Sequence, residues 1–301
     1  MTTPQINLRQ ASSLAVAKYD RPVITAYRLG LIIFRMLKAG RIDGQVLTRL
    51  GPPNRRHYRQ ALNFLVSYAV LAELKDLPQE SAFTVLGRSS VSAAEIACTV
   101  DPFAYVSHLS AMEMHGLTDR VAQTLYLSSP DPKSWTRFAA ELMQRDLGDD
   151  LAEYQAAKFP RLTRTRMEKL MGTAVRITHS SHLGAFRKTP DSEVRVATIG
   201  RTFIDMLREP GLCGGIHHVL AIYREHAERN LALIAAEVDQ HGGPIDKVRA
   251  GHVLEERCGL VHPSFEEWQT HAARGGSRRL VAANEYAPTY SERWALSLNA
   301  D

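Results

Sequence analysis

The stretch from Arg55 to Ser67 constrains the fold more than any other part of this sequence. At 100° per residue, as in an α-helix, Tyr58, Ala61, Leu62 and Leu65 form one apolar stripe. Over the same thirteen residues the stretch contains arginines but no Asp or Glu. We therefore expect an amphipathic helix whose solvent face is free of acidic side chains.

The face opposite the apolar stripe is basic and amide-rich: it carries Arg56, Gln60, Asn63 and Ser67, with Arg55 and Arg59 at its flanks. An arginine can bind a phosphate or the edge of guanine with two hydrogen bonds, and Gln or Asn can do the same with adenine. The helix is therefore predicted to bind DNA, through Arg55, Arg56, Arg59, Gln60 and Asn63. The alternative is a basic, solvated face of a helical bundle.

The segments around this helix predict a winged helix-turn-helix domain. Thr25 can cap a helix over residues 26–37 that stops at Gly40, and a short second helix is expected over residues 44–50. After the third helix, residues 69–74 and 82–86 alternate as the two strands of a hairpin. In such a domain the third helix enters the major groove and the hairpin lies along the DNA backbone. Lys75 in the hairpin loop is a further predicted DNA contact, although Asp76 and Glu80 in that loop oppose contact with phosphate.

The charge of the chain is divided unevenly. Of its 301 residues, the first 90 contain 13 Lys and Arg against 5 Asp and Glu, whereas residues 91–301 contain 24 against 27. A basic module joined to a nearly neutral body is typical of a protein in which one domain meets a polyanion. We therefore predict an N-terminal arm (residues 1–24), a winged helix-turn-helix DNA-binding domain (25–90) and a second domain (91–301).

The part after residue 90 is predicted to mix helices and strands. Alternating segments at 123–128, 174–179 and 193–198 predict strands, and residues 107–116 and 201–207 have helical periodicity. A helical tail is expected from the segments 215–224, 228–239, 245–257 and 264–272. Because no regular strand–helix–strand order is present, the predicted fold class of the chain is α+β, a winged-helix domain followed by a mixed α/β domain with a helical tail.

The sequence lacks the common signatures of catalytic and cofactor sites. It contains no GxxxxGK[ST], GxGxxG, HExxH or GxSxG motif. The pairs His179/His182 and His217/His218 have a metal-like spacing, but no cluster of carboxylates or thiols accompanies them. We therefore expect no enzyme activity, no cofactor and no metal site. A nuclease built from scattered Asp, Glu and Lys side chains is the alternative.

Three features predict a soluble cytoplasmic protein without a membrane partner. No apolar run reaches the roughly 18 to 20 residues that a membrane span requires. The first ten residues do not have the basic-then-apolar order of a secretory signal. The three cysteines, Cys98, Cys213 and Cys258, lie far apart and cannot all pair, as expected in a reducing compartment.

Two segments beyond residue 100 resemble motifs of a known family. Residues 107–118 read SHLSAMEMHGLT and are similar to the S-x-x-S-A-L-x-x-H-G-L-T helix of the AbiEi antitoxins, with Met112 in place of Leu. Residues 201–210 read RTFIDMLREP and are similar to that family's R-T-x-x-D-x-L-x-x-P segment, which a pair of glycines follows. The resemblance covers most of residues 25–255; the long N-terminal arm and the tail after Gly275 depart from it. The matching positions are Ser107, Ser110, His115, Gly116, Arg201, Thr202, Asp205, Gly214 and Gly215.

The resemblance implies an antitoxin of a type IV toxin–antitoxin or abortive-infection system. Such proteins repress their own operon through the N-terminal domain, and their C-terminal domain counters a nucleotidyltransferase-like toxin. The implied partners are double-stranded operator DNA and that toxin. One recognition helix reads only a few base pairs, so we expect a monomer in solution that pairs on an inverted repeat. The alternatives are a winged-helix regulator whose second domain senses a small ligand, and a nucleic-acid-processing enzyme.

The motif residues also have a purely structural interpretation. Thr202 can cap a helix, and Arg201 can pair with Asp205 at the i,i+4 spacing. The two glycines after residue 213 allow a sharp turn between helices, and His115 followed by glycine is typical of a helix C-terminus. Roles in folding alone would account for both segments.

Overall fold

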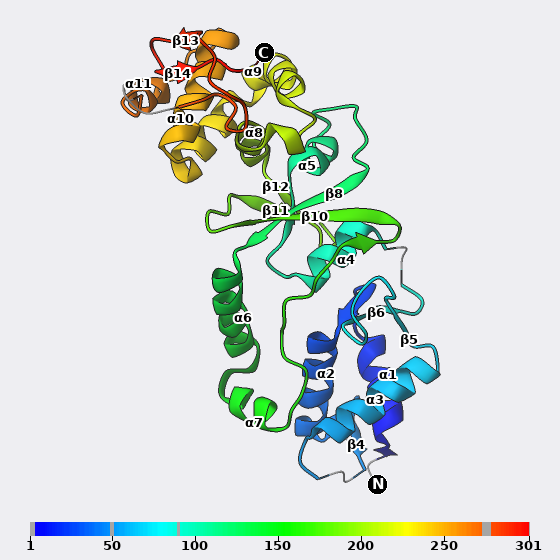
Figure 1. Ribbon diagram of the computed structural model, residues 1–301. Helices are drawn as coiled ribbons and strands as arrows, with labels where there is room; N and C mark the ends of the chain where they lie inside the picture. The colour runs from blue at the N-terminus through cyan, green and yellow to red at the C-terminus, as the bar shows by residue number, and fades with distance from the viewer. Residues whose placement is uncertain (1–3, 49–50, 89–90, 273–277, 301) are drawn as a thin grey trace. The chain divides into compact units, whose positions relative to one another are not determined.

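The computed structural model describes residues 4–48, 51–88, 91–272 and 278–300 (Figure 1). The chain forms two compact units, each built from separated segments. The first unit takes in residues 1–103 and 131–173, and the second takes in residues 104–130 and 174–301. The sequence-based boundary at residue 90 therefore differs from the structure, in which the chain returns to the first unit after residue 130.

Three helices of the first unit pack beside a three-stranded sheet. The helices are α1 (Leu8–Ala17), α2 (Ala26–Ala39) and α3 (Arg55–Ser67). The antiparallel sheet has the order β2-β6-β5, formed by β2 (Val23–Thr25), β6 (Ala82–Val85) and β5 (Leu71–Glu73). The predicted strands at 69–74 and 82–86 are thus confirmed, and the structure adds β2 to them.

The ends of α2 and α3 follow from their capping residues, as the sequence predicts. The Thr25 hydroxyl accepts a hydrogen bond from the Arg28 amide at 3.2 Å, and Gly40 ends α2 with φ +63°. At the start of α3, the Asn54 side chain accepts hydrogen bonds from the amides of Arg56 and His57. The stripe Tyr58, Ala61, Leu62 and Leu65 is buried, as expected.

The predicted N-terminal arm is instead an integral part of the first unit. Asn7 caps α1, which contacts both α2 and α3. Its buried face consists of Leu8, Ala11, Ser12, Ala15 and Val16, which have helical spacing. Three of these five are Ala or Ser, so a search for large apolar residues does not detect the stripe. Small side chains nevertheless let the helix approach its neighbours closely.

The predicted second helix at residues 44–50 is wrong over the described part of that segment. Strands β3 (Arg41–Ile42) and β4 (Gln45–Leu47) form a hairpin there, and β4 also pairs with β1 (Gln5–Ile6). Asp43 and Gly44 form the turn with φ of +51° and +74°. An Asp-Gly pair with two positive φ values favours a two-residue hairpin over a helix. Residues 49 and 50 lie outside the described part.

Residues 131–173 complete the core of the first unit. They form α6 (Pro132–Leu147), a 3-10 turn (Gly148–Asp150), α7 (Leu151–Ala156) and β9 (Lys169–Leu170). Helix α4 (Ala93–Val100), from the N-terminal segment, belongs to the same unit. Tyr154 is fully buried, and its ring lies edge-on to Phe34 of α2 at 5.1 Å. Phe159 contacts both rings. An aromatic cluster therefore joins the two segments of this unit.

The second unit is built around a mixed sheet. Its strands follow the order β11-β12-β7-β8-β10: β11 (Phe186–Lys188), β12 (Arg195–Ala197), β7 (Tyr105–Val106), β8 (Thr124–Pro130) and β10 (Thr173–Ser180). The pairs β8–β10 and β7–β12 are parallel, whereas β7–β8 and β11–β12 are antiparallel. Helix α5 (His108–Met114) contacts β8.

Helices make up most of the remaining second unit (Figure 1). They are α8 (Ile199–Arg208), η2 (Pro210–Leu212), α9 (Ile216–His241), α10 (Pro244–Gly251), the π-helical turn η3 (His252–Arg257) and α11 (Ser264–Gln269), followed by β13 (Tyr290–Ser291) and β14 (Leu296–Ser297). Helix α9 is continuous where two helices were expected, because residues 225–227 contain neither Gly nor Pro. The α+β fold class is confirmed.

Candidate functional site

The exposed face of α3 brings together the polar residues that the sequence placed on one side of this helix. Arg56, Gln60 and Asn63 are all exposed, as is Ser67 one turn further on. They line a hollow of about 610 Å³, which we call the α3 hollow. Its complete lining is Arg9, Arg56, Arg59, Gln60, Asn63, Phe64, Ser67 and Tyr68.

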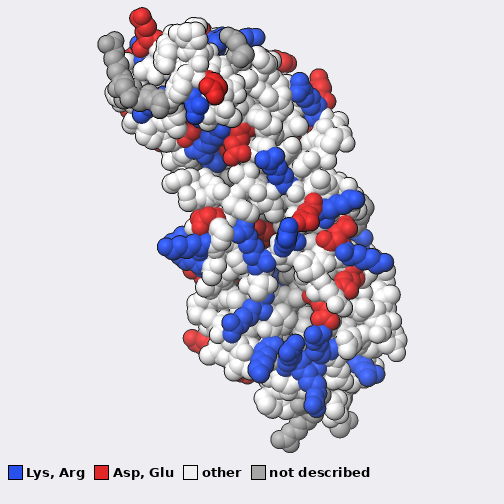
Figure 2. Space-filling model, viewed as in Figure 1, with Lys and Arg blue, Asp and Glu red and all other residues white. Residues whose placement is uncertain are grey.

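The α3 hollow is a positively charged site. Three arginines line it, and no Asp or Glu does. Among the described residues, neither Arg9 nor Arg56 has an ion-pair partner. Basic side chains gather in the space-filling view over the face where α1 and α3 lie in Figure 1 (Figure 2). A polyanion is the ligand that such a surface attracts.

Arg9 is a site residue that sequence reasoning missed. It lies in α1, exposed, and α1 contacts α3. Its neighbours Leu8 and Ala11 belong to the buried face of α1, so a helical interpretation of residues 8–17 would have turned Arg9 outward. The small side chains on that buried face concealed this signal.

Arg59 lies in the α3 hollow but already has a carboxylate partner. Its Nη1 atom is 2.5 and 2.6 Å from the two carboxylate oxygens of Glu80, in the loop between β5 and β6. Another acidic side chain of that loop, Asp76, accepts a hydrogen bond from the Met171 amide at 2.7 Å. Two acidic residues of this loop therefore bind it to Arg59 and to the Met171 amide. Lys75 of the same loop is exposed and does not line the hollow. Arg55 is likewise exposed and outside the hollow.

The motif residues of α5 hold that helix in the second unit. The Ser110 hydroxyl accepts a hydrogen bond from the Tyr126 amide at 3.0 Å and donates one to the Thr124 carbonyl at 3.2 Å. His115 caps the C-terminal end of α5, and Gly116 follows with φ +62°, as expected. The His115 Nε2 atom donates to the Ala197 carbonyl of β12 at 2.7 Å. This last bond links the first motif segment to the strand that precedes the second.

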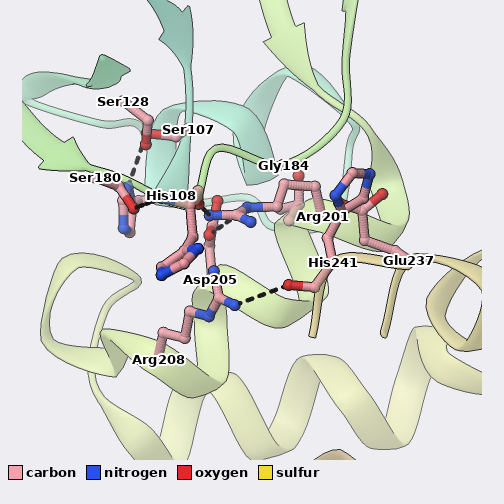
Figure 3. A network of polar contacts seen from close by, with 12 residues as sticks. Ser107, His108, Ser128, Ser180, Gly184, Arg201, Asp205, Arg208, Glu237 and His241 are labelled. Atoms are coloured by element: carbon pink, nitrogen blue, oxygen red, sulfur yellow. Dashed lines mark hydrogen bonds and ion pairs between the residues drawn. The ribbon is translucent and has the colours of Figure 1, made fainter. Parts of the chain in front are cut away.

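A buried polar network surrounds the second motif (Figure 3). The predicted pair forms: Arg201 Nε is 2.8 Å from Asp205 Oδ1, and both side chains are at most 4% exposed. Gly184 leaves the necessary space, because a Cβ atom there would lie 2.2 Å from Arg201 Cδ. Thr202 does not cap α8, contrary to expectation. Thr198 accepts from the Arg201 amide, since the helix begins one turn earlier.

Two further motif features have clear structural roles. Gly214 and Gly215 have φ of +87° and +93°, which turns the chain sharply into α9 as predicted. Ser107 is fully buried; its hydroxyl accepts from Ser128 at 2.9 Å and lies 2.8 Å from Nδ1 of His108. His108 has φ +51°, an uncommon conformation for a residue other than glycine. Burial lowers the pKa of the His108 imidazole below its usual value, against the opposing influence of Asp205 and Glu209.

The second unit also has a largely apolar groove of about 770 Å³, which we call the β12–α9 groove. Met114, Val196, Ile199, Leu233 and Ala236 provide much of its apolar surface. Met114 and Leu233 are each about half exposed. His115 lines the groove as well, so the groove lies beside the C-terminal end of the first motif segment.

Two features are absent from the part of the chain that the structure describes. Nowhere in this part of the chain do three or more His, Cys, Asp or Glu side chains gather in a way that could hold a metal ion. None of the helices in the described ranges has both the length and the apolar character needed to cross a membrane.

Comparison with known proteins gives a distant likeness among solved structures. No protein-family model matches the chain, and no curated protein matches it. Among solved structures, the chain is similar to the crystal structure of the RV2827C protein from Mycobacterium tuberculosis, with 14% sequence identity and a TM-score of 0.46. That alignment covers 96% of this chain and 89% of the other.

Proposed function

We propose that this protein is a DNA-binding transcriptional repressor whose first unit binds operator DNA. The observation that carries the proposal is the α3 hollow. Arg56, Gln60 and Asn63 are exposed side by side there, Arg9 joins them from α1, and no acidic side chain lines the site. Arginine matches phosphate and guanine, and the two amides match adenine, so the face suits the major groove of double-stranded DNA.

The order of elements in the first unit supports a winged helix-turn-helix. These elements follow the order α1-β2-α2-α3-β5-β6 along the chain, and the three strands form one antiparallel sheet. In this proposal α2 and α3 form the helix-turn-helix pair, with the β3–β4 hairpin inside the turn. Helix α3 is the recognition helix, and residues 74–81 form the wing.

For the second unit we propose the antitoxin role that the AbiEi resemblance implies. The packing of α5 against α8 supports it, because these two helices carry the segments that resemble the family. The protein would then repress its own operon and counter a nucleotidyltransferase-like toxin. One α3 helix per chain reads only a few base pairs, so two monomers would load onto an inverted repeat.

The test has three parts. Gel shifts with the chain's own promoter DNA, against unrelated competitor DNA, should show specific binding that weakens as salt rises. Analytical ultracentrifugation should show a monomer alone and two copies on the operator. Co-expression with a nucleotidyltransferase encoded beside this gene should restore growth. Binding of the promoter no better than the competitor would contradict the repressor proposal, and failure to restore growth would contradict the antitoxin role.

The β12–α9 groove favours a second candidate, a regulator whose second unit senses a small ligand. Its volume lies within the 300 to 1,000 Å³ typical of ligand sites, and its lining is mainly apolar with a few polar groups. A Leu233→Trp variant would fill part of this groove. In the sensor proposal the variant changes operator affinity, whereas in the antitoxin proposal operator affinity stays the same.

A further inference from the structure

The α3 hollow contains two aromatic rings that a purely polar DNA contact does not require. The centroids of Phe64 and Tyr68 are 4.4 Å apart. Phe64 is partly buried, whereas Tyr68, at the C-terminal end of α3, is 68% exposed. The partly buried Phe64 ring therefore packs against the Tyr68 ring, and Tyr68 is mostly exposed to solvent.

The rings lie beside the amide side chains of the same face. Gln60 and Phe64 are four residues apart on α3, so their side chains are neighbours along the helix. Asn63 and Ser67 have the same spacing three residues later. The Gln60 amide thus lies next to an aromatic ring, and the Asn63 amide lies next to a hydroxyl. All four residues line the α3 hollow.

An A·T base pair presents a matching combination in the major groove. Its adenine offers N6 and N7, to which a Gln or Asn amide can bind with two hydrogen bonds, and its thymine offers a methyl group at C5. A G·C pair has no methyl group and offers a different pattern of donors and acceptors. A face with an amide next to an aromatic ring therefore favours A·T over G·C.

We infer that Phe64 and Tyr68 determine sequence specificity by covering a thymine methyl group in the operator. Gln60 or Asn63 binds the adenine at or beside that base pair. This inference rests on the proposed binding of duplex DNA by α3. It adds an apolar component to the recognition, which the arginines and amides alone do not supply.

The experiment removes the methyl group and nothing else. In the shortest promoter duplex that the protein protects from nuclease, each thymine is replaced in turn by deoxyuridine, which keeps the same hydrogen bonds. Burying one methyl group favours binding about fourfold, so one or two positions should lose about fourfold in affinity with the wild-type protein. With Tyr68→Ala the same positions should show no loss, and the affinity for the unmodified duplex should fall by a similar factor.

A matched control uses the same helix. Val66 is also an exposed apolar residue of α3, but it does not line the hollow. Val66→Ala should keep the full penalty for uracil. Circular dichroism should show that both variants remain folded, as expected for substitutions of exposed side chains.

The possible failures are distinguishable. Wild-type binding that is indifferent to uracil at every position would overturn the inference while leaving the repressor proposal intact. A uracil penalty that persists in Tyr68→Ala would overturn it as well. Absence of specific binding to any promoter duplex would overturn both the inference and the proposed function.

Discussion

The guanidinium of Arg59 contacts both carboxylate oxygens of Glu80, at 2.5 and 2.6 Å. The pair joins the middle of α3 to the loop between β5 and β6. It also compensates the charge of one of the three arginines in the α3 hollow. In this state Arg59 contributes little to the attraction of a phosphate, whereas Arg9 and Arg56 have no such partner among the described residues.

We therefore predict that Glu80→Gln strengthens DNA binding and makes it more dependent on salt. Release of Arg59 would add one phosphate contact, and each such contact contributes about 0.9 to the slope of log K against log salt concentration. Fluorescence anisotropy with promoter DNA at several salt concentrations measures this slope. Asp20→Asn is the control, because it removes an exposed acid of the same unit that does not pair with α3. An equal change of slope in both variants would mean that only overall charge matters.

A second prediction concerns sequence specificity. The triple variant Arg56→Ala, Gln60→Ala, Asn63→Ala should lose its preference for the promoter, because these side chains line the face that would meet base edges. Each lost contact to a base is worth about 1 to 3 kcal/mol of discrimination. Competition gel shifts with promoter and unrelated duplexes measure the loss. Arg55→Ala, outside the hollow, should weaken binding to both duplexes alike.

The sequence predicted α2, α3 and the β5–β6 hairpin of the first unit from local signals. Thr25, Gly40 and Asn54 mark helix ends through their own backbone and capping chemistry, so α2 and α3 were predictable. The hairpin at Asp43-Gly44 carried a local signal too, but the helical interpretation of residues 44–50 overrode it. Arg9 was missed because the buried face of α1 consists largely of small residues.

The long-range features could not be predicted from a local pattern. Nothing in the periodicity of residues 131–173 indicates that this segment returns to the first unit, since the partner of Tyr154 is Phe34, far away in the sequence. The Arg59–Glu80 contact likewise depends on how the β5–β6 loop folds back. By contrast, Arg201 and Asp205 are four residues apart in one helix, and their pairing was predictable for that reason.

A third prediction tests whether residues 131–173 belong to the core of the first unit. Tyr154→Ala should lower the free energy of unfolding by about 3 to 5 kcal/mol, as is typical for removal of a buried aromatic ring. Chemical denaturation followed by circular dichroism measures it. Ala152→Ser, an exposed position on the same helix, should have little effect. A cost under about 1 kcal/mol for Tyr154→Ala would show that this segment does not stabilise the unit.

A fourth prediction concerns the buried pair Arg201–Asp205. Asp205→Ala would leave the guanidinium of Arg201 buried without its partner, at a cost of about 3 to 5 kcal/mol of stability. The double variant Arg201→Met, Asp205→Ala should be less destabilised than the sum of the two single variants. Denaturant titrations of all four proteins complete the cycle. If the two effects simply add, the side chains do not depend on each other.

The last prediction follows from the lowered pKa of His108. In the unfolded chain an imidazole has a pKa of about 6.5, so at pH values below this the unfolded state binds a proton that the folded state resists. The stability that the neutral imidazole contributes is complete above about pH 6.5 and is lost as the pH falls toward the folded pKa. His108→Asn removes the titrating group, and Asn tolerates the positive φ of this position better than most residues. The free energy of unfolding, measured by denaturant titration from pH 7.5 to 5.5, should therefore fall less for His108→Asn than for the wild-type protein. His252, whose pKa burial also lowers, is present in both proteins and cancels in this comparison. An identical loss in the two proteins would show that protonation of His108 is not what destabilises the folded state.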